Sequence, residues 1–165
     1  MSFDVYFFEP SAADDWEAAL EALEEVGEDL LSEADLEQWS SIVAAVEPVL
    51  PETVSYESET VRQLTVEAIG LQLTLSPGEL SLTVPYWSTG DEAERTVRLL
   101  RDVASAVEGA TGLIAYDPQS DGPFLAGSTE AAGQSFERAA TVLDDVRAGR
   151  ATAEPPPKRR WFGRR

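Results

Sequence analysis

The sequence has no cysteine, no histidine and only a single lysine. Without cysteine the chain forms no disulfide bond and has no thiol nucleophile. Without histidine it lacks the commonest general base, and both absences together remove the usual ligands of zinc, copper and haem. We therefore predict no catalytic residues, no metal site and no cofactor, and we favour a protein that is not an enzyme.

Long apolar runs are also missing. No stretch approaches the roughly 18 consecutive apolar residues of a transmembrane helix, so we expect none. The start of the chain has neither the basic nor the apolar region of a secretory signal, which favours a cytoplasmic location. The 165 residues, 43% of them apolar, suffice for one domain with a hydrophobic core. We assign this domain to residues 1–149 and expect residues 150–165, which begin as a proline-rich spacer, to be disordered.

Charge is distributed very unevenly along the chain. There are 31 acidic and 12 basic residues, and five of the basic ones lie within residues 158–165, which we call the basic segment. Residues 1–157 keep 7 basic and 31 acidic side chains, a formal charge of −24. A body this acidic repels nucleic acid and anionic lipid, whereas the basic segment attracts them weakly. Its candidate binding residues are Lys158, Arg159, Arg160, Trp161, Phe162, Arg164 and Arg165.

The spacing of apolar residues predicts four helices. Helical spacing follows Ser11, with Trp16, Leu20 and Leu23 on one stripe, and Ser32 is the expected N-cap of the next helix. The third helix follows residues 89–92 and ends near Gly109 and Gly112, and the fourth covers about 129–148.

Alternating and compact apolar runs predict four strands. The clearest signal is a hairpin, with alternating leucines over 71–75 and 80–84 and a Pro77-Gly78 turn between them. Residues 3–8 and 113–116 are the other two strands, and residues 51–61 are interpreted as a connection. The resulting order, β-αα-β-β-α-β-α, is a split βαβ pattern. It predicts an α+β fold in which helices pack on one face of a four-stranded, mostly antiparallel sheet.

Three segments of the sequence resemble a known protein family. They are the start Met1-Ser2-Phe3-Asp4-Val5-Tyr6-Phe7, the strand end Val84-Pro85-Tyr86-Trp87 and the run Thr111-Gly112-Leu113-Ile114-Ala115-Tyr116-Asp117-Pro118-Gln119. They resemble a family of small bacterial cytoplasmic proteins with no firmly assigned activity. Some members are similar to immunity-type proteins found beside secreted toxins. The resemblance covers most of residues 1–119, supports the assignment of a single domain, and implies a loosely immunity-like role.

Polar residues follow the strand at 113–116. Tyr116, Asp117 and Gln119 lie where the chain leaves the sheet and are candidate partner-binding residues. Asp117 and Asp121 are placed to share a hard cation, which would support a metal-assisted enzyme. The alternative, which we favour, is that Asp117 and Pro118 form a turn.

Two aromatic residues, Tyr86 and Trp87, follow the second strand of the hairpin. If they are exposed, they would anchor a protein partner. If they are buried, they would close one end of the core. Trp16 and Trp39 lie on helical stripes and are expected in the core.

Acidic residues are concentrated on the first helix, including Glu17, Glu21 and Glu24. They form either a solvated surface or a surface complementary to a basic protein. The leading hypothesis is a non-catalytic domain that binds, and in its immunity-type form neutralises, a basic protein. The alternatives are a membrane-surface adaptor that uses the basic segment, and the metal-assisted enzyme.

Overall fold

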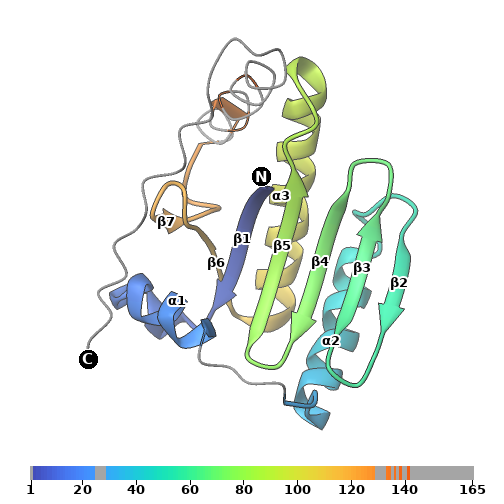
Figure 1. The fold of residues 1–165 in the computed structure, drawn as a ribbon, viewed down its shortest axis with the longest axis vertical. Helices are drawn as coiled ribbons and strands as arrows, with labels where there is room; N and C mark the ends of the chain where they lie inside the picture. The colour runs from blue at the N-terminus through green and yellow to red at the C-terminus, as the bar shows by residue number, and fades with distance from the viewer. Residues whose placement is uncertain are drawn as a thin grey trace.

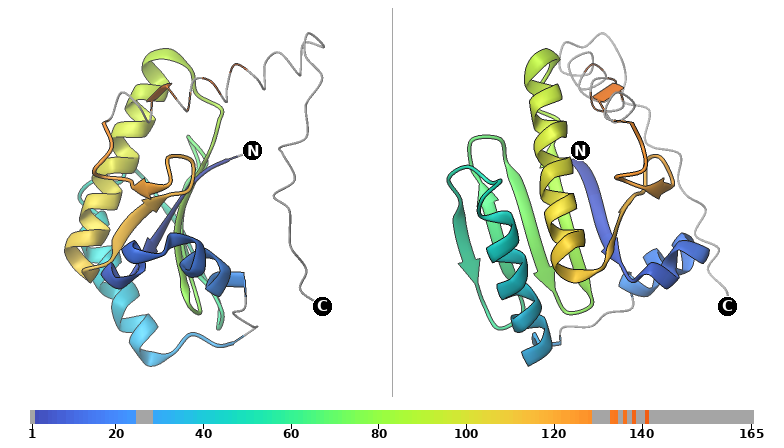
Figure 2. Two further views of the ribbon diagram at one scale, coloured as in Figure 1. Left: turned by 90° about the vertical axis from the view of Figure 1, so that its left-hand side faces the viewer. Right: turned by 180° about the vertical axis from the view of Figure 1, so that it is seen from behind.

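A seven-stranded antiparallel sheet organises the fold in the computed structural model, which describes residues 2–24 and 29–128 together with 133, 134, 136, 138 and 141. In chain order the elements are β1 (Ser2–Phe8), a 3-10 helix η1 (Pro10–Asp14), α1 (Trp16–Glu24), α2 (Glu33–Val46), β2 (Val54–Glu57), β3 (Arg62–Val66), β4 (Leu71–Ser76), β5 (Glu79–Pro85), α3 (Gly90–Thr111), β6 (Ile114–Asp117) and β7 (Gly122–Pro123). The strands lie in the order β2-β3-β4-β5-β1-β6-β7. Helices α2 and α3 lie behind the sheet in Figure 1 and in front of it in the reverse view of Figure 2.

The predicted hairpin is formed by β4 and β5. Ser76 pairs with Glu79, so Pro77 and Gly78 form a two-residue turn, and Gly78 has a φ of 75°. This left-handed backbone conformation is the one that glycine adopts without steric cost. The hairpin prediction is therefore confirmed, and Pro85 ends β5 as expected.

The core lies between the sheet and helices α2 and α3. Strand β1 buries alternate residues there, and α3 buries an apolar stripe along the opposite wall. Ser32 caps α2 in a reciprocal capping box with Asp35, and Gly112 ends α3 in the left-handed conformation, as predicted. The core residues of β1 and the stripe of α3 are Phe3, Val5, Phe7, Ala93, Val97, Leu100, Ala104 and Val107.

The α+β class and the antiparallel pairing are confirmed, but the prediction of four strands is wrong. Strands β2 and β3 extend the sheet on one side, and β2 lies within the segment that was interpreted as a connection, residues 51–61. All four residues of β2 are exposed, so this edge strand has no alternation of apolar and polar residues for a sequence pattern to detect. Strand β7 has only two residues and adds a seventh strand at the other edge.

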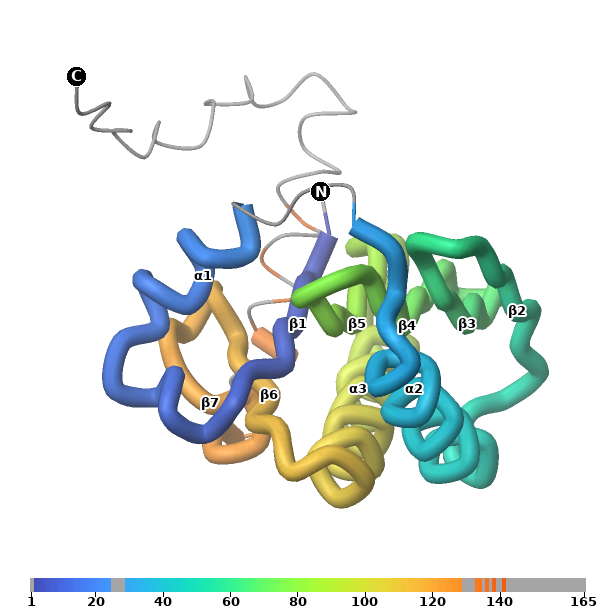
Figure 3. The backbone as a smooth tube through the Cα atoms, turned by 90° about the horizontal axis from the view of Figure 1, so that it is seen from below, coloured from blue at the N-terminus to red at the C-terminus, as the bar shows by residue number. Residues whose placement is uncertain are grey.

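The prediction that all helices pack on one face of the sheet is also wrong, because α1 lies on the other face. Leu20 and Leu23 of α1 line a cleft with Asp4 and Tyr6, which alternate along β1 with the residues of the core. Figure 3 shows α1 on the side of the sheet opposite α2 and α3. The short apolar stripe of α1 buries no residue completely, so its side chains only partly cover this second face.

Several predicted features lie outside the described residues. They are the spacer and basic segment within 150–165 and most of the fourth helix at 129–148. The five described positions after residue 128 are helical, and Phe136 among them is completely buried. Within the described residues no helix is both long and apolar enough to cross a bilayer.

Candidate functional site

A cleft of about 620 Å³ opens on the second face of the sheet, between α1 and β1. Its polar floor comes from β1, and its apolar wall comes from α1. Residues at both ends of β5 and the turn after β6 close the remaining sides. The lining residues are Ser2, Asp4, Tyr6, Leu20, Leu23, Glu24, Glu79, Tyr86, Pro118 and Gln119. The volume is within the range of about 300–1,000 Å³ that is typical of ligand-binding pockets.

Aromatic stacking holds α1 over this face. The ring of Trp16, the first residue of α1, stacks on Tyr116 with 4.6 Å between ring centroids, and it lies 6.0 Å from Phe8. Tyr116 pairs across the sheet with Tyr6, which places the stack beside the floor of the cleft. Trp16 was predicted to lie in the main core. It is instead partly buried on the other side of the sheet, where it anchors the wall of the cleft.

The cleft is negatively charged. Three of its ten lining residues, Asp4, Glu24 and Glu79, are carboxylates, and none is a lysine or arginine. The described part of the chain supplies no ion-pair partner for them; its one salt bridge joins Arg98 and Glu94 on α3. Burial, followed by the charges of Asp4 and Glu79, raises the pKa of the Tyr6 hydroxyl above its ordinary value. A cation entering the cleft would therefore be stabilised by several carboxylates at once.

Tyr86 forms part of the cleft wall, and most of its ring is buried. Its hydroxyl donates a hydrogen bond of 2.9 Å to Oε1 of Gln119, and its ring centroid lies 5.0 Å from that of Phe136. Burial, as the largest cause, raises the pKa of Tyr86 to about 12. Trp87 is 65% exposed. The two predicted aromatic anchors therefore separate, because Tyr86 is a buried part of the cleft wall and Trp87 is exposed outside the cleft.

Asp117 forms the turn that the alternative reading of the sequence favours. It is buried, and its carboxylate accepts the backbone N–H of Gln119 and the hydroxyl of Ser120. The hydroxyl of Tyr116 donates to Asp121 at 2.7 Å, so this second carboxylate is also engaged. Among the described residues no group of three or more histidine, cysteine or acidic side chains is placed to hold a metal ion.

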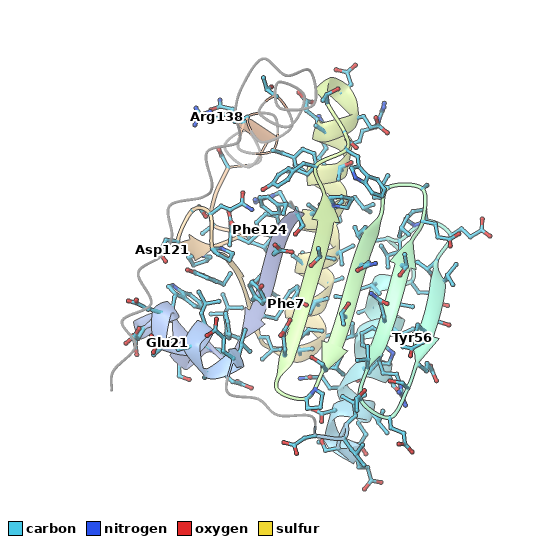
Figure 4. The ribbon with its side chains drawn as sticks, viewed as in Figure 1. Phe7, Glu21, Tyr56, Asp121, Phe124 and Arg138 are labelled. Atoms are coloured by element: carbon cyan, nitrogen blue, oxygen red, sulfur yellow. The ribbon has the colours of Figure 1, made fainter. Side chains whose placement is uncertain are left out.

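The acidic residues predicted on the first helix are exposed. Glu24 lines the cleft, whereas Glu17 and Glu21 lie elsewhere on the surface of α1. Figure 4 shows Glu21 on α1 and Tyr56 on β2 at opposite edges of the sheet. The structure therefore brings together three predicted residues, Glu24, Tyr86 and Gln119, and leaves Glu17, Glu21 and Trp87 outside the cleft.

Sequence reasoning missed most of the cleft, including Asp4, Tyr6 and Glu79. The sequence does contain one signal of an acidic surface on these elements: no basic residue precedes Arg62. Every element before it, β1 and α1 included, is therefore free of cationic side chains. The predicted binding residues of the basic segment lie outside the described residues.

Searches of protein families, curated proteins and solved structures found no match to this chain. The family resemblance drawn from the sequence therefore stays a prediction.

Proposed function

We propose that this protein is a non-catalytic binding domain that holds a cationic segment of a partner protein in the cleft between α1 and β1. The observation that supports the proposal best is the composition of the cleft: among the described residues that line it, three are carboxylates, two are leucines and none is basic. Arginine and lysine match such a site, because their charged ends pair with carboxylates while their aliphatic stems pack on leucine.

The surroundings of the cleft support the same class of ligand. Glu17 and Glu21 on the outer surface of α1 extend the negative field beyond the cleft. A field of one sign accelerates capture of an oppositely charged partner and disfavours partners of like charge. Neutralisation of a basic toxin is the most specific form of this proposal, and its support is the resemblance to immunity-type proteins.

The geometry favours binding over catalysis. The polar groups near the cleft that were candidates for chemistry, Asp117, Asp121 and Tyr86, are engaged in hydrogen bonds that shape the turn after β6 and the wall of the cleft. A metal-assisted reaction at Asp117 and Asp121 would require these carboxylates to leave their present partners.

The proposal is tested with a fluorescent hepta-arginine peptide, whose binding is followed by anisotropy near physiological salt. The background is the full chain with K158Q, R159Q, R160Q, R164Q and R165Q, so that the basic segment does not compete. In this background, D4N/E79Q should weaken binding about 5- to 30-fold, since each lost charge contact with a partly buried carboxylate costs about 0.5–1 kcal/mol.

The matched control is E57Q/E67Q, which removes the same charge at exposed positions of β2 and the β3–β4 turn. It should change the affinity by no more than about twofold, because charges more than a Debye length away are screened. Equal losses in the two double variants would show that only net charge matters, and the cleft would then not be the binding site.

A further inference from the structure

We infer that the basic segment, residues 158–165 of this same chain, docks into the cleft and competes there with the external partner. The inference depends on the function proposed for the cleft, and it adds a specific occupant. Three arguments support it: the chemistry of the two surfaces, the length of chain between them, and the high local concentration that one chain gives to its own segments.

The side chains of the basic segment complement those of the cleft. The segment has five cations around the adjacent pair Trp161 and Phe162. The cleft offers carboxylates on its floor and rim and the side chains of Leu20 and Leu23 on its wall. A guanidinium group pairs with a carboxylate through two parallel hydrogen bonds, and an aromatic ring packs on leucine. The seven other basic residues of the chain have no such neighbouring pair of aromatic residues.

The last well-anchored part of the described chain lies beside the cleft. Phe136 is completely buried and packs against Tyr86, whose side chain lines the cleft. Thr141 is the last described residue, and Lys158 follows it 17 positions later, after 16 intervening residues. Fully extended, this stretch spans at most about 55–60 Å. A domain of this size is roughly 30 Å across, taken as twice its radius of gyration, so the stretch is longer than the domain. The basic segment can therefore reach the cleft of its own domain.

Tethering makes even a weak contact effective. A tether of this length gives a local concentration of about 1 mM. If the isolated segment binds with a dissociation constant of about 100 μM, the cleft is then occupied about ten times more often than it is empty. An external cationic ligand would consequently bind the natural chain roughly tenfold more weakly than a chain whose segment is neutral. The effect should decrease with added salt, since the Debye length falls from about 10 Å at 0.1 M to about 3 Å at 1 M.

The experiment is a cycle of four full-length chains, titrated with the same hepta-arginine peptide. They are the natural chain, the chain with all five basic residues of the segment changed to glutamine, and both of these with D4N/E79Q. Neutralising the segment should strengthen peptide binding about tenfold when the cleft is intact. The same change should have an effect of no more than about threefold when the cleft carries D4N/E79Q, because the weakened segment then competes less.

The outcomes separate this inference from the proposed function. If the peptide binds the intact cleft equally well with and without the charged segment, the inference is wrong while the proposed function stands. If the peptide shows no preference for the intact cleft in the neutral-segment chain, the proposed function itself is wrong.

A second variant tests docking against diffuse attraction. W161A/F162A keeps all five charges of the segment and removes its aromatic side chains. Docking against Leu20 and Leu23 predicts that this variant binds the peptide at least about threefold more tightly than the natural chain. Peptide affinity equal to that of the natural chain would mean that the segment only screens the acidic surface, which overturns the inference.

Discussion

Replacing Trp16 by alanine should release α1 from the sheet and so remove the cleft, although no charged residue is replaced. Trp16 stacks on Tyr116 and lies close to Phe8, and no residue of α1 is completely buried. An aromatic pair contributes about 0.5–1.5 kcal/mol beyond the burial of its area, so two pairs contribute about 1–3 kcal/mol. With the loss of buried apolar area, we expect W16A to lower the free energy of unfolding by about 2–4 kcal/mol.

The loss should be concentrated in α1. A helix of nine residues is not stable in water by itself, so α1 that no longer packs on the sheet should unfold. Hydrogen exchange measured by mass spectrometry should therefore show nearly unprotected α1 amides in W16A, while the amides of β4 and β5 remain protected. The peptide affinity should fall as well, because Leu20, Leu23 and Glu24 leave the cleft together.

The matched control is Trp87→Ala, since Trp87 is 65% exposed. This variant should lose less than about 1 kcal/mol of stability and keep the wild-type exchange of α1. The reasoning is refuted if α1 of W16A exchanges as slowly as in the natural chain, or if both tryptophan variants have the same effect.

Three further predictions concern single residues of the fold. D117A should lower the free energy of unfolding in urea by about 2–4 kcal/mol, since two donors lose their acceptor, whereas D117N should cost less than about 1 kcal/mol. In an ultraviolet titration with Y86F as the reference, Tyr86 should ionise near pH 12. Because its pKa in the folded chain exceeds the ordinary value of 10.0, the stability that Tyr86 contributes relative to Y86F should be constant below pH 10 and fall as the pH rises toward 12. G70A should destabilise the protein by more than about 1 kcal/mol in thermal unfolding, because the residue has a φ of +68° and a Cβ would lie 2.8 Å from Cγ of Pro85. Its control, G109A, should stabilise the protein by about 0.5–1 kcal/mol, because a Cβ on this residue of α3 meets open space.

The parts of the fold that follow local rules were predictable. The β4–β5 hairpin combines leucines of period two with a proline-glycine turn, and α3 combines a buried stripe of period 3.6 with Gly112 at its end. Each of these signals is contained within a few neighbouring residues, so no knowledge of distant segments was needed. The turn at Asp117 was predictable for the same reason, because its hydrogen bonds reach only two and three residues ahead.

The edges of the sheet were not predictable in this way. Strand β2 is exposed on both faces, and its position is fixed by backbone pairing with β3 instead of by burial of side chains. Strand β7 has two residues and pairs with the end of β6. A sequence pattern reports burial, so strands that bury little leave almost no pattern.

The sequence by itself determined the charge of the molecule, the absence of thiol and imidazole chemistry, and the main amphipathic elements, because composition and short-range periodicity are properties of the chain alone. Only the tertiary structure decided where the acidic residues meet. Asp4, Glu24 and Glu79 are far apart in sequence, and they share one cleft because β1 pairs with β5 while Trp16 holds α1 over the face that the core leaves open. That juxtaposition depends on strand order and on the side of the sheet that a helix chooses, and long-range packing decides both.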